Sequence, residues 1–250
     1  DHQLTAQALA NVASIDVEGG RLAEAETALV RAMKIHEAGL EPDDFKTIRL
    51  RGQLATVHLR QGRLAQAGAG LRAQLAALER AMPAEYPATG MAQYWLARAL
   101  LAQGKYDEAV TRSRRAGEII AARKSRSLAQ RLSGGVRETA ASDDVFALEV
   151  RAAFAAAQAR PAEAAALRDA AFAAAQRATF DETGRAVAHM ASRASAGSDA
   201  LAALLREQQD LLRQLTSLEQ RLANAIGASD PAARAQAAPL RLEAADMAAR

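Results

Sequence analysis

Cysteine is absent from the 250-residue sequence. Disulfide bonds, thiolate metal sites and cysteine nucleophiles are therefore excluded within these residues. Aromatic residues make up only 4% of the chain, and alanine dominates the apolar residues. Because alanine has the highest helix propensity and a very small side chain, this composition favours an all-α fold whose helix axes approach closely.

Long apolar runs are also missing. No run approaches the roughly 20 residues that a membrane-spanning helix needs, and no basic start followed by an apolar stretch indicates a signal peptide. We therefore expect a cytoplasmic protein by default. The chain begins at Asp1, and its last helical pattern reaches Arg250 without a stop signal, so we expect an excised part of a longer protein.

Motifs that carry catalysis or bind cofactors are absent as well. The sequence has neither a GxSxG nucleophile turn nor a GxxxxGKS or GxxxxGKT phosphate loop. The stretch HEAGL at residues 36–40 begins like a zinc helix but lacks a second histidine four residues on. The remaining histidines are dispersed: His2, His58 and His189. We predict no catalytic residue, no metal site and no cofactor, and hence a protein that is not an enzyme.

Three similar stretches are present in the first half: VEGGRLAEAE, RQGRLAQAGA and LAQGKYDEAV. They share a glycine and an alanine five positions later, and both recur at a constant interval of 42 positions: Gly20, Gly62 and Gly104, and Ala25, Ala67 and Ala109. A constant period of this size is typical of stacked helical repeats, which form a solenoid.

Each repeat is expected to form a pair of helices, one before the glycine and one after it. Apolar side chains recur at helical spacing over residues 91–102 and again over residues 106–120. A glycine just after a helix commonly adopts the left-handed conformation, and the alanine is expected where the two helices meet. Residues 1–124 are thus predicted to form three helix pairs.

Beyond residue 124 the period is lost. Residues 125–143 are predicted to form a polar linker that contains two adjacent glycines. Residues 144–197 are expected to form further helices, with Phe146, Val150 and Phe154 on one apolar face and Pro161 at the start of the next helix.

Residues 198–250 are predicted to form a long helical hairpin. Alternating spacings of three and four, which are typical of a coiled-coil seam, relate Leu201, Leu204, Gln208, Leu211, Leu215, Leu218 and Leu222. A returning helix that begins near Pro231 and kinks at Pro239 would cover this seam. A homodimer through residues 201–222 is the alternative.

The order of helix, glycine, base, leucine or tyrosine, and alanine resembles the tetratricopeptide repeat, and the 42-residue length resembles the repeats of kinesin light chains. This resemblance implies a solenoid whose first helices line a concave surface that binds a protein or peptide. The family's inward positions correspond here to Gln7, Asn11, Ser14, Arg49, Gln53, Thr56, Arg60, Tyr94 and Arg98. We expect a polar, mildly basic groove suited to an acidic segment, because arginine makes bidentate contacts with carboxylates. A purely structural spacer is the alternative.

The second half resembles the connecting region of bacterial proteins that join tetratricopeptide repeats to a C-terminal CHAT domain. The matching runs are FAAAQ at 172–176, MASR at 190–193 and ALLREQQDLL at 203–212. The CHAT domain of that family is caspase-like and uses a histidine and a cysteine, neither of which transfers to this chain. The resemblance implies that residues 1–250 are the recognition and regulatory half of a larger protein, with its own C-terminal domain as a partner.

Basic residues are concentrated in the segment 112–137, in which Glu118 is the only acidic residue. The next acidic residue, Glu138, lies just beyond its end. Clustered bases can bind nucleic acid, because neutralising the phosphate backbone releases counterions. No aromatic side chain is interleaved for base stacking, and a solvated helix face explains the same charges. Nucleic-acid binding is therefore the alternative function, and protein binding is the main expectation.

Overall fold

The computed structural model describes residues 2–39, 44–84, 86–131, 140–176, 199–228 and 230–249, and the regular structure within these ranges is helical, without a strand. The all-α prediction is confirmed. None of the helices in these ranges is long and apolar enough to cross a bilayer. The helices are α1 (His2–Glu18), α2 (Leu22–Glu37), α3 (Phe45–Arg60), α4 (Leu64–Ala81), α5 (Pro87–Ala102), α6 (Tyr106–Arg131), α7 (Ala140–Ala159), η1 (Pro161–Glu163), α9 (Asp199–Ile226), α10 (Pro231–Ala235) and α11 (Ala237–Ala249), with residues 164–176 also helical.

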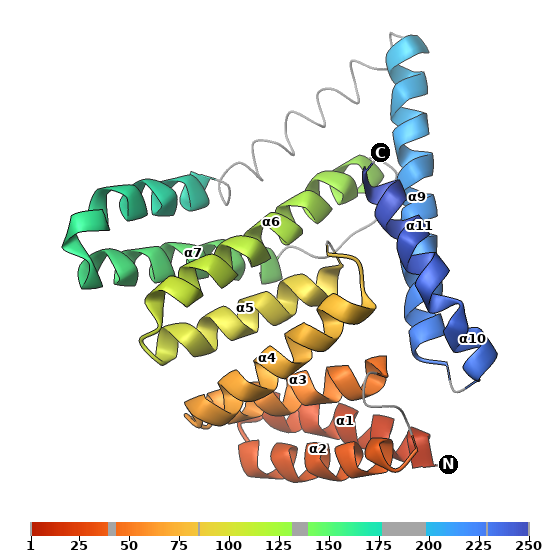
Figure 1. Cartoon of the computed structure of the whole chain (residues 1–250), viewed down its shortest axis with the longest axis horizontal. Coiled ribbons are helices and arrows are strands. Elements are labelled where there is room, and N and C mark those ends of the chain that lie inside the picture. The colour runs from red at the N-terminus through yellow and green to blue at the C-terminus, as the bar shows by residue number, and fades with distance from the viewer. Residues whose placement is uncertain are drawn as a thin grey trace.

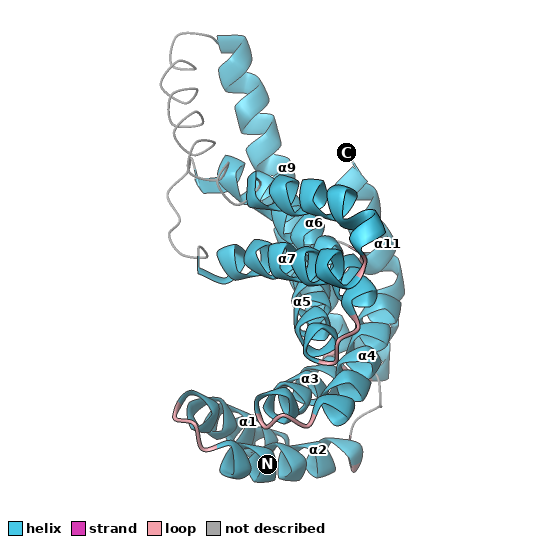
Figure 2. Ribbon diagram, turned by 90° about the vertical axis from the view of Figure 1, so that its left-hand side faces the viewer, coloured by secondary structure: helices cyan, strands magenta, loops and turns pink. Residues whose placement is uncertain are grey.

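The first six helices form three pairs that stack in chain order (Figure 1). Helices α1 and α2, α3 and α4, and α5 and α6 contact each other within the pairs, while α2 with α3 and α4 with α5 join successive pairs. Figure 2 shows that the stack is curved, with α1, α3 and α5 toward the inside of the arc and α2 and α4 toward the outside. This is the solenoid of helix pairs that the 42-residue period predicts.

A left-handed glycine follows the first helix of every pair. The φ angles of Gly20, Gly62 and Gly104 are 75°, 76° and 73°. Each turn is closed by a hydrogen bond across the glycine, from Arg21 N to Asp16 O (2.8 Å), Arg63 N to His58 O (2.9 Å) and Lys105 N to Leu100 O (2.9 Å). These bonds satisfy carbonyl groups that a helix end leaves without partners. The conformation predicted for the three glycines is confirmed.

Small side chains lie where the helices of a pair meet. Ala25, Ala67 and Ala109 are all 0% exposed. In the second pair, a Cβ atom added to Gly70 would lie 2.8 Å from the Cβ of Ala55, which is closer than carbon atoms approach. A larger side chain at these contacts would therefore force the helices apart.

A repeated glutamine connects each pair to the one before it. Gln61 Nε2 donates to the carbonyl oxygen of Leu22 (3.2 Å), and one repeat later Gln103 Nε2 donates to that of Leu64 (2.6 Å). A Cβ at Gly68 would lie 2.6 Å from Gln103 Nε2, so this glycine leaves room for the amide. Carbonyls in the first turn of a helix already accept a bond from an amide of that helix, so each glutamine uses a second lone pair and adds a link between successive pairs.

The segment after the third pair is more helical than predicted. Helix α6 continues to Arg131 and α7 begins at Ala140, so both ends of the predicted linker 125–143 belong to helices. Of the segment 144–197, in which further helices were predicted, the described part contains most of α7, η1 and the helical residues 164–176, and residues 177–197 lie outside the described ranges. Pro161 opens the one-turn helix η1, after Arg160 at its N-cap.

The buried face of α7 differs from the predicted one. Phe146 is 2% exposed, but Phe154 is 56% exposed and does not belong to the core. Alanines form half of the buried positions of α7, which packs against α5 and α6: Ala152, Ala153, Ala156 and Ala157. The helical spacing of the large apolar residues was misleading because small residues allow α7 to approach its neighbours closely.

Helices α9, α10 and α11 form a hairpin beside the helix pairs (Figure 1). α9 contacts α11 and also α6. Leu218 and Leu222 of the predicted seam are 4% and 0% exposed, and they share one apolar core with Ile48 and Leu78 of the helix pairs. This part of the seam is therefore covered within the chain. The seam positions Leu201, Leu204 and Gln208 lie outside the described side chains.

The returning segment is interrupted one turn before Pro239. α10 ends at Ala235 and α11 begins at Ala237, so the break lies at Gln236. Pro239 has no amide hydrogen to donate to the carbonyl of Ala235, which removes the bond that would continue α10 into α11. The effect of the proline thus falls earlier than the kink predicted at Pro239 itself.

We expect Gly62→Ala to lower the free energy of unfolding by about 1 kcal/mol, because an L side chain is strained at a left-handed φ. No atom lies within 4 Å of a Cβ at this position, so the loss isolates backbone strain from steric overlap. Gly62→Asn should lose less, since asparagine tolerates this conformation. Urea unfolding measures the difference, with Gly39→Ala as the control because Gly39 does not have a positive φ. Equal stability of the two alanine variants would contradict the expectation.

Candidate functional site

The inside of the arc is formed by the first helix of each pair, so residues 42 positions apart occupy equivalent places on it (Figure 2). We call a set of residues 42 positions apart a repeat column. Three columns on these helices contain only exposed and half-buried side chains, and together with Arg60 we call them the inner row: Gln7, Arg49 and Met91; Asn11, Gln53 and Trp95; Ser14, Thr56 and Arg98. The structure brings six of the seven main predicted site residues into this row: Asn11, Arg49, Gln53, Thr56, Arg60 and Arg98.

A ladder of polar contacts joins α1 to α3 along the inner row. Arg49 Nη2 donates to Gln7 Oε1 (2.5 Å), whose amide nitrogen in turn donates to Asn11 Oδ1 (2.9 Å). Gln53 Nε2 lies 3.4 Å from Ser14 Oγ, further along the same pair of helices. At the end of α3, Arg60 Nη1 donates to the carbonyl oxygen of Val17 (3.2 Å), while Thr56 bonds within its own helix. The ladder orients the polar side chains of the first two pairs.

The third pair contributes an aromatic side chain, and it is Trp95 rather than Tyr94. Tyr94 is 5% exposed and lies in a core cluster with Val145 and Leu148 of α7, so its ring is not accessible to a bound segment. Trp95 is half-buried, and the Arg98 guanidinium carbon lies 4.8 Å from the centre of its ring. The 42-residue period could have identified Trp95 as the accessible residue. Trp95 shares its column with Asn11 and Gln53, whereas Tyr94 shares the buried column of Ala10 and Gly52.

The inner row is positively charged. Arg49, Arg60 and Arg98 are exposed, and within the described residues no carboxylate pairs with any of the three. Arginines elsewhere on the helix pairs do have acidic partners, such as Arg63 with Glu26 and Arg72 with Glu108. Unneutralised guanidinium groups, each with donors left over, can make bidentate contacts with carboxylates.

Comparison with known proteins identifies the architecture of this surface. Residues 4–69 match the tetratricopeptide repeat family model. The matched range contains most of the first unit and the inner helix of the second, and so the α1–α3 ladder. This fold typically serves as a non-catalytic scaffold for protein–protein interactions. No curated protein matches the sequence.

Solved structures share the arrangement of tetratricopeptide units. The crystal structure of BtubC (BKLC) from P. vanneervenii matches with a TM-score of 0.59 and 17% identity, over 74% of this chain and 65% of that chain. This chain thus spans slightly less than two thirds of BtubC. A protein from Podosopora anserina, described as a putative kinesin light chain with nearly identical TPR-like repeats, matches with a TM-score of 0.52 and 20% identity, over 84% of this chain and 95% of that one. At these identities the likeness establishes the fold alone.

An ion cluster forms where the first two helix pairs meet, and the sequence did not reveal it. Glu26 of α2 accepts hydrogen bonds from Gln61 Nε2 (3.1 Å) and from the Arg63 guanidinium, and its Oε1 lies 3.3 Å from Nε2 of His58. The hydrogen bond from Arg63 contributes most to lowering the pKa of Glu26 to about 2. Such a carboxylate is ionised at neutral pH and is a weak general base. The cluster therefore links units and is poorly suited to proton transfer.

The histidine of the HEAGL stretch lies in the core. His36 is 3% exposed, and burial lowers the pKa of its imidazole, which favours the neutral form. It occupies the same repeat column as Leu78 and Ile120 and fills a largely apolar position. Across the part of the chain that the structure describes, no three His, Asp or Glu side chains are gathered so that they could share a metal ion.

The basic segment 112–137 has internal partners in its described part. Arg112 Nη1 donates to Gln93 Oε1 (3.4 Å), and Arg115 Nη1 donates to Glu118 (3.1 Å). Arg114 Nε lies 3.8 Å from the carboxylate of Glu149, which is buried between α6 and α7. The side chains of residues 123–137 are outside the described ones. The described arginines thus support contacts within and between helices, which weakens the alternative of a phosphate-binding patch.

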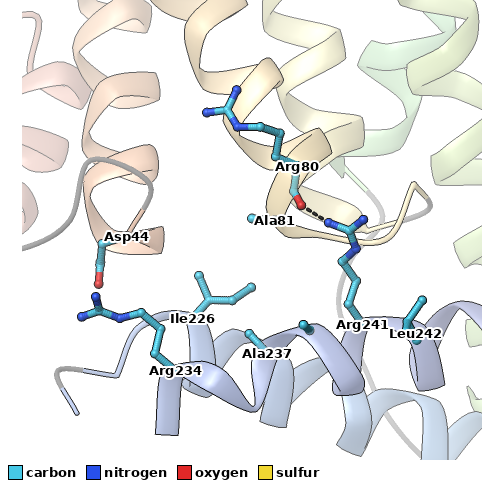
Figure 3. Close-up of a pocket in the computed structure, with 9 residues that line it drawn as sticks. Asp44, Arg80, Ala81, Ile226, Arg234, Ala237, Arg241 and Leu242 are labelled. Atoms are coloured by element: carbon cyan, nitrogen blue, oxygen red, sulfur yellow. Dashed lines mark hydrogen bonds between the residues drawn. The ribbon is translucent and has the colours of Figure 1, made fainter. Parts of the chain in front are cut away.

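A cavity of about 490 Å³ lies between the second helix pair and the C-terminal hairpin (Figure 3). Its charged side chains act at helix ends. Asp44 Oδ1 accepts a hydrogen bond from Lys46 N (2.8 Å) at the start of α3, and the Arg241 guanidinium donates to the carbonyl of Arg80 at the end of α4. Arg234 donates to the carbonyl of Ala228 (3.1 Å). Helix capping accounts for the Asp44 and Arg241 contacts, while Arg234 bonds to the loop between α9 and α10, and we regard the cavity as a joint between the two parts.

We expect the stability of the protein to depend on the ionisation of Glu26. Because its folded-state pKa is about 2, below the ordinary value of 4.5, the ionised group stabilises the fold above pH 4.5, and this contribution is lost as the pH falls from 4.5 toward 2. Glu26→Gln should flatten this part of the profile and cost on the order of 1 kcal/mol at pH 7, since solvent screens the partly exposed pair.

Urea unfolding at a series of pH values measures this dependence. Glu108→Gln is the matched control, because Glu108 also pairs with an arginine but is 50% exposed. A Glu26→Gln profile parallel to that of the unmodified protein would contradict the assignment.

Proposed function

We propose that this chain is a protein-interaction scaffold whose inner row binds an acidic segment of a partner protein. The observation that carries the proposal is the set of exposed arginines on this face, Arg49, Arg60 and Arg98, which have no carboxylate partner among the described residues. Electrostatic complementarity of this kind attracts an acidic partner and excludes a basic one. Tetratricopeptide folds also use their concave side for binding, which supports the same face.

The polar ladder supports this function because it holds the arginines before a partner arrives. Arg49 is oriented by Gln7, Arg60 by the carbonyl of Val17, and Arg98 by the ring of Trp95. A side chain that is already ordered loses less conformational entropy on binding. The exposed amide group of Asn11 can bond to the backbone of an extended segment.

We expect the double variant Arg49→Glu, Arg98→Glu to lose binding of a short fluorescein-labelled peptide of alternating glutamate and serine. Two charge reversals on the inner row should weaken binding by at least about tenfold, because attraction at two contacts becomes repulsion. Fluorescence anisotropy at low ionic strength measures the affinity, and circular dichroism checks that helicity is unchanged.

The control is Arg31→Glu, Arg221→Glu, which changes the net charge equally at exposed positions of α2 and α9. It should bind the peptide nearly as well as the unmodified protein. Unchanged binding by the inner-row variant, or an equal loss of affinity in both double variants, would show that the inner row is not the binding site of the acidic segment.

We further propose that this scaffold is the recognition and regulatory half of a larger protein with a caspase-like CHAT domain. The FAAAQ, MASR and ALLREQQDLL runs support this proposal, and the absence of cysteine leaves any such chemistry to another domain. Reading the coding sequence beyond Arg250 tests it. A downstream α/β domain with a histidine and a cysteine in caspase-like context is the expected result. A stop codon or an unrelated domain would overturn the CHAT assignment and leave a free-standing adaptor.

A further inference from the structure

The burial pattern of α7 repeats that of α5 when Thr89 is aligned with Val145. Nine positions of α5 are buried, from Thr89 to Leu100. Seven of the nine equivalent positions in α7 are buried as well, and the other two are half-buried: the seven are Val145, Phe146, Leu148, Glu149, Ala152, Ala153 and Ala156. A helix that buries the same positions against its neighbours occupies the same kind of place in the stack.

The contacts of α7 agree with this equivalence. α7 contacts α6 extensively and α5 less, as α5 contacts α4 extensively and α3 less. In Figure 2, α7 continues the inner side of the arc beyond α5. The helical residues 164–176 run back beside α7 (Figure 1), and Leu167 and Ala171 pack against the core cluster that contains Ala152 and Ala156, so the two helices form a fourth pair. The extension of α6 to Arg131 makes this spacing longer than the period of the first three units, which hides the fourth unit from a search for the period.

If α7 is an inner helix, it adds a fourth set of side chains to the inner row. The equivalents of Met91, Trp95 and Arg98 are Ala147, Arg151 and Phe154, and all three are exposed. Phe154 is 56% exposed, an unusual state for a phenyl ring that has no role in the core. The guanidinium of Arg151 lies along its own helix, with Nε 3.4 Å from the carbonyl oxygen of Ala147.

We propose that Arg151 and Phe154 complete the binding face, and that the acidic segment of the partner places one large apolar side chain against Phe154. This inference rests on the proposed function of the inner row. The apolar members of the inner row lie at this end, where Met91 and Trp95 of α5 pack against the core cluster that contains Val145 of α7, while the inner-row side chains of α1 and α3 are polar. Arg98 and Arg151 flank the apolar surface, so carboxylates on either side of the apolar residue meet a positive charge.

Two labelled peptides test the inference: the peptide of alternating glutamate and serine, and the same peptide with one central serine replaced by leucine. We expect the unmodified protein to bind the leucine peptide about tenfold more tightly, as burial of one apolar side chain provides. Phe154→Ala should bring the affinity for the leucine peptide down to that for the serine peptide and leave the latter unchanged. Because Phe154 is largely exposed, this variant should keep the helicity and thermal stability of the unmodified protein.

Phe172→Ala is the control, since Phe172 is 65% exposed but lies on the helical residues 164–176, outside the inner row. It should retain the preference for leucine. Equal affinity for both peptides, or a preference for the leucine peptide that survives Phe154→Ala, would overturn this inference. In either case, peptide binding that depends on Arg49 and Arg98 would still support the proposed function. Failure of both peptides to bind, or binding indifferent to those arginines, would overturn both.

Discussion

The close approach of paired helices is the constraint on which this structure depends. Ala25, Ala67 and Ala109 are fully buried between the helices of their pairs, and no larger side chain fits there without moving a helix. Gly70 meets Ala55 in the same way. Because the small contact recurs at the same place in each unit, the pairs have similar shapes and stack with a similar rotation. The curved inner row is a consequence of that regularity.

Local interactions explain why much of the fold was predictable from the sequence. The left-handed conformation of Gly62 and the burial of Ala67 depend on neighbouring residues and on the period, both of which the sequence contains. The Gln61 and Gln103 bonds to the preceding unit were not predictable, because they depend on the distance between units. The Glu26 cluster was missed for the same reason, since it joins side chains from two successive units.

The inner row was predictable in its first two units and less so afterwards. In the third unit, the predicted residue Tyr94 was one position out of register, since Trp95 and not Tyr94 lies 42 positions after Gln53. In α7, the spacing of Phe146 and Phe154 indicated one apolar face, yet Phe154 is exposed and alanines occupy half of the buried positions. This second error arises because small residues pack in the core there while a large one remains at the surface, the reverse of the usual pattern.

The C-terminal hairpin packs against the curved stack and stabilises its shape. Leu218 and Leu222 of α9 share a core with Ile48 of the second unit and Leu100 of the third, so these units cannot open relative to each other without breaking that core. Arg241 adds a bond to the carbonyl of Arg80, a residue 161 positions earlier in the chain. A displacement of α11 therefore reaches the middle of the solenoid directly through space. The shape of the concave side and the position of the C-terminal helices are therefore mechanically coupled through these contacts.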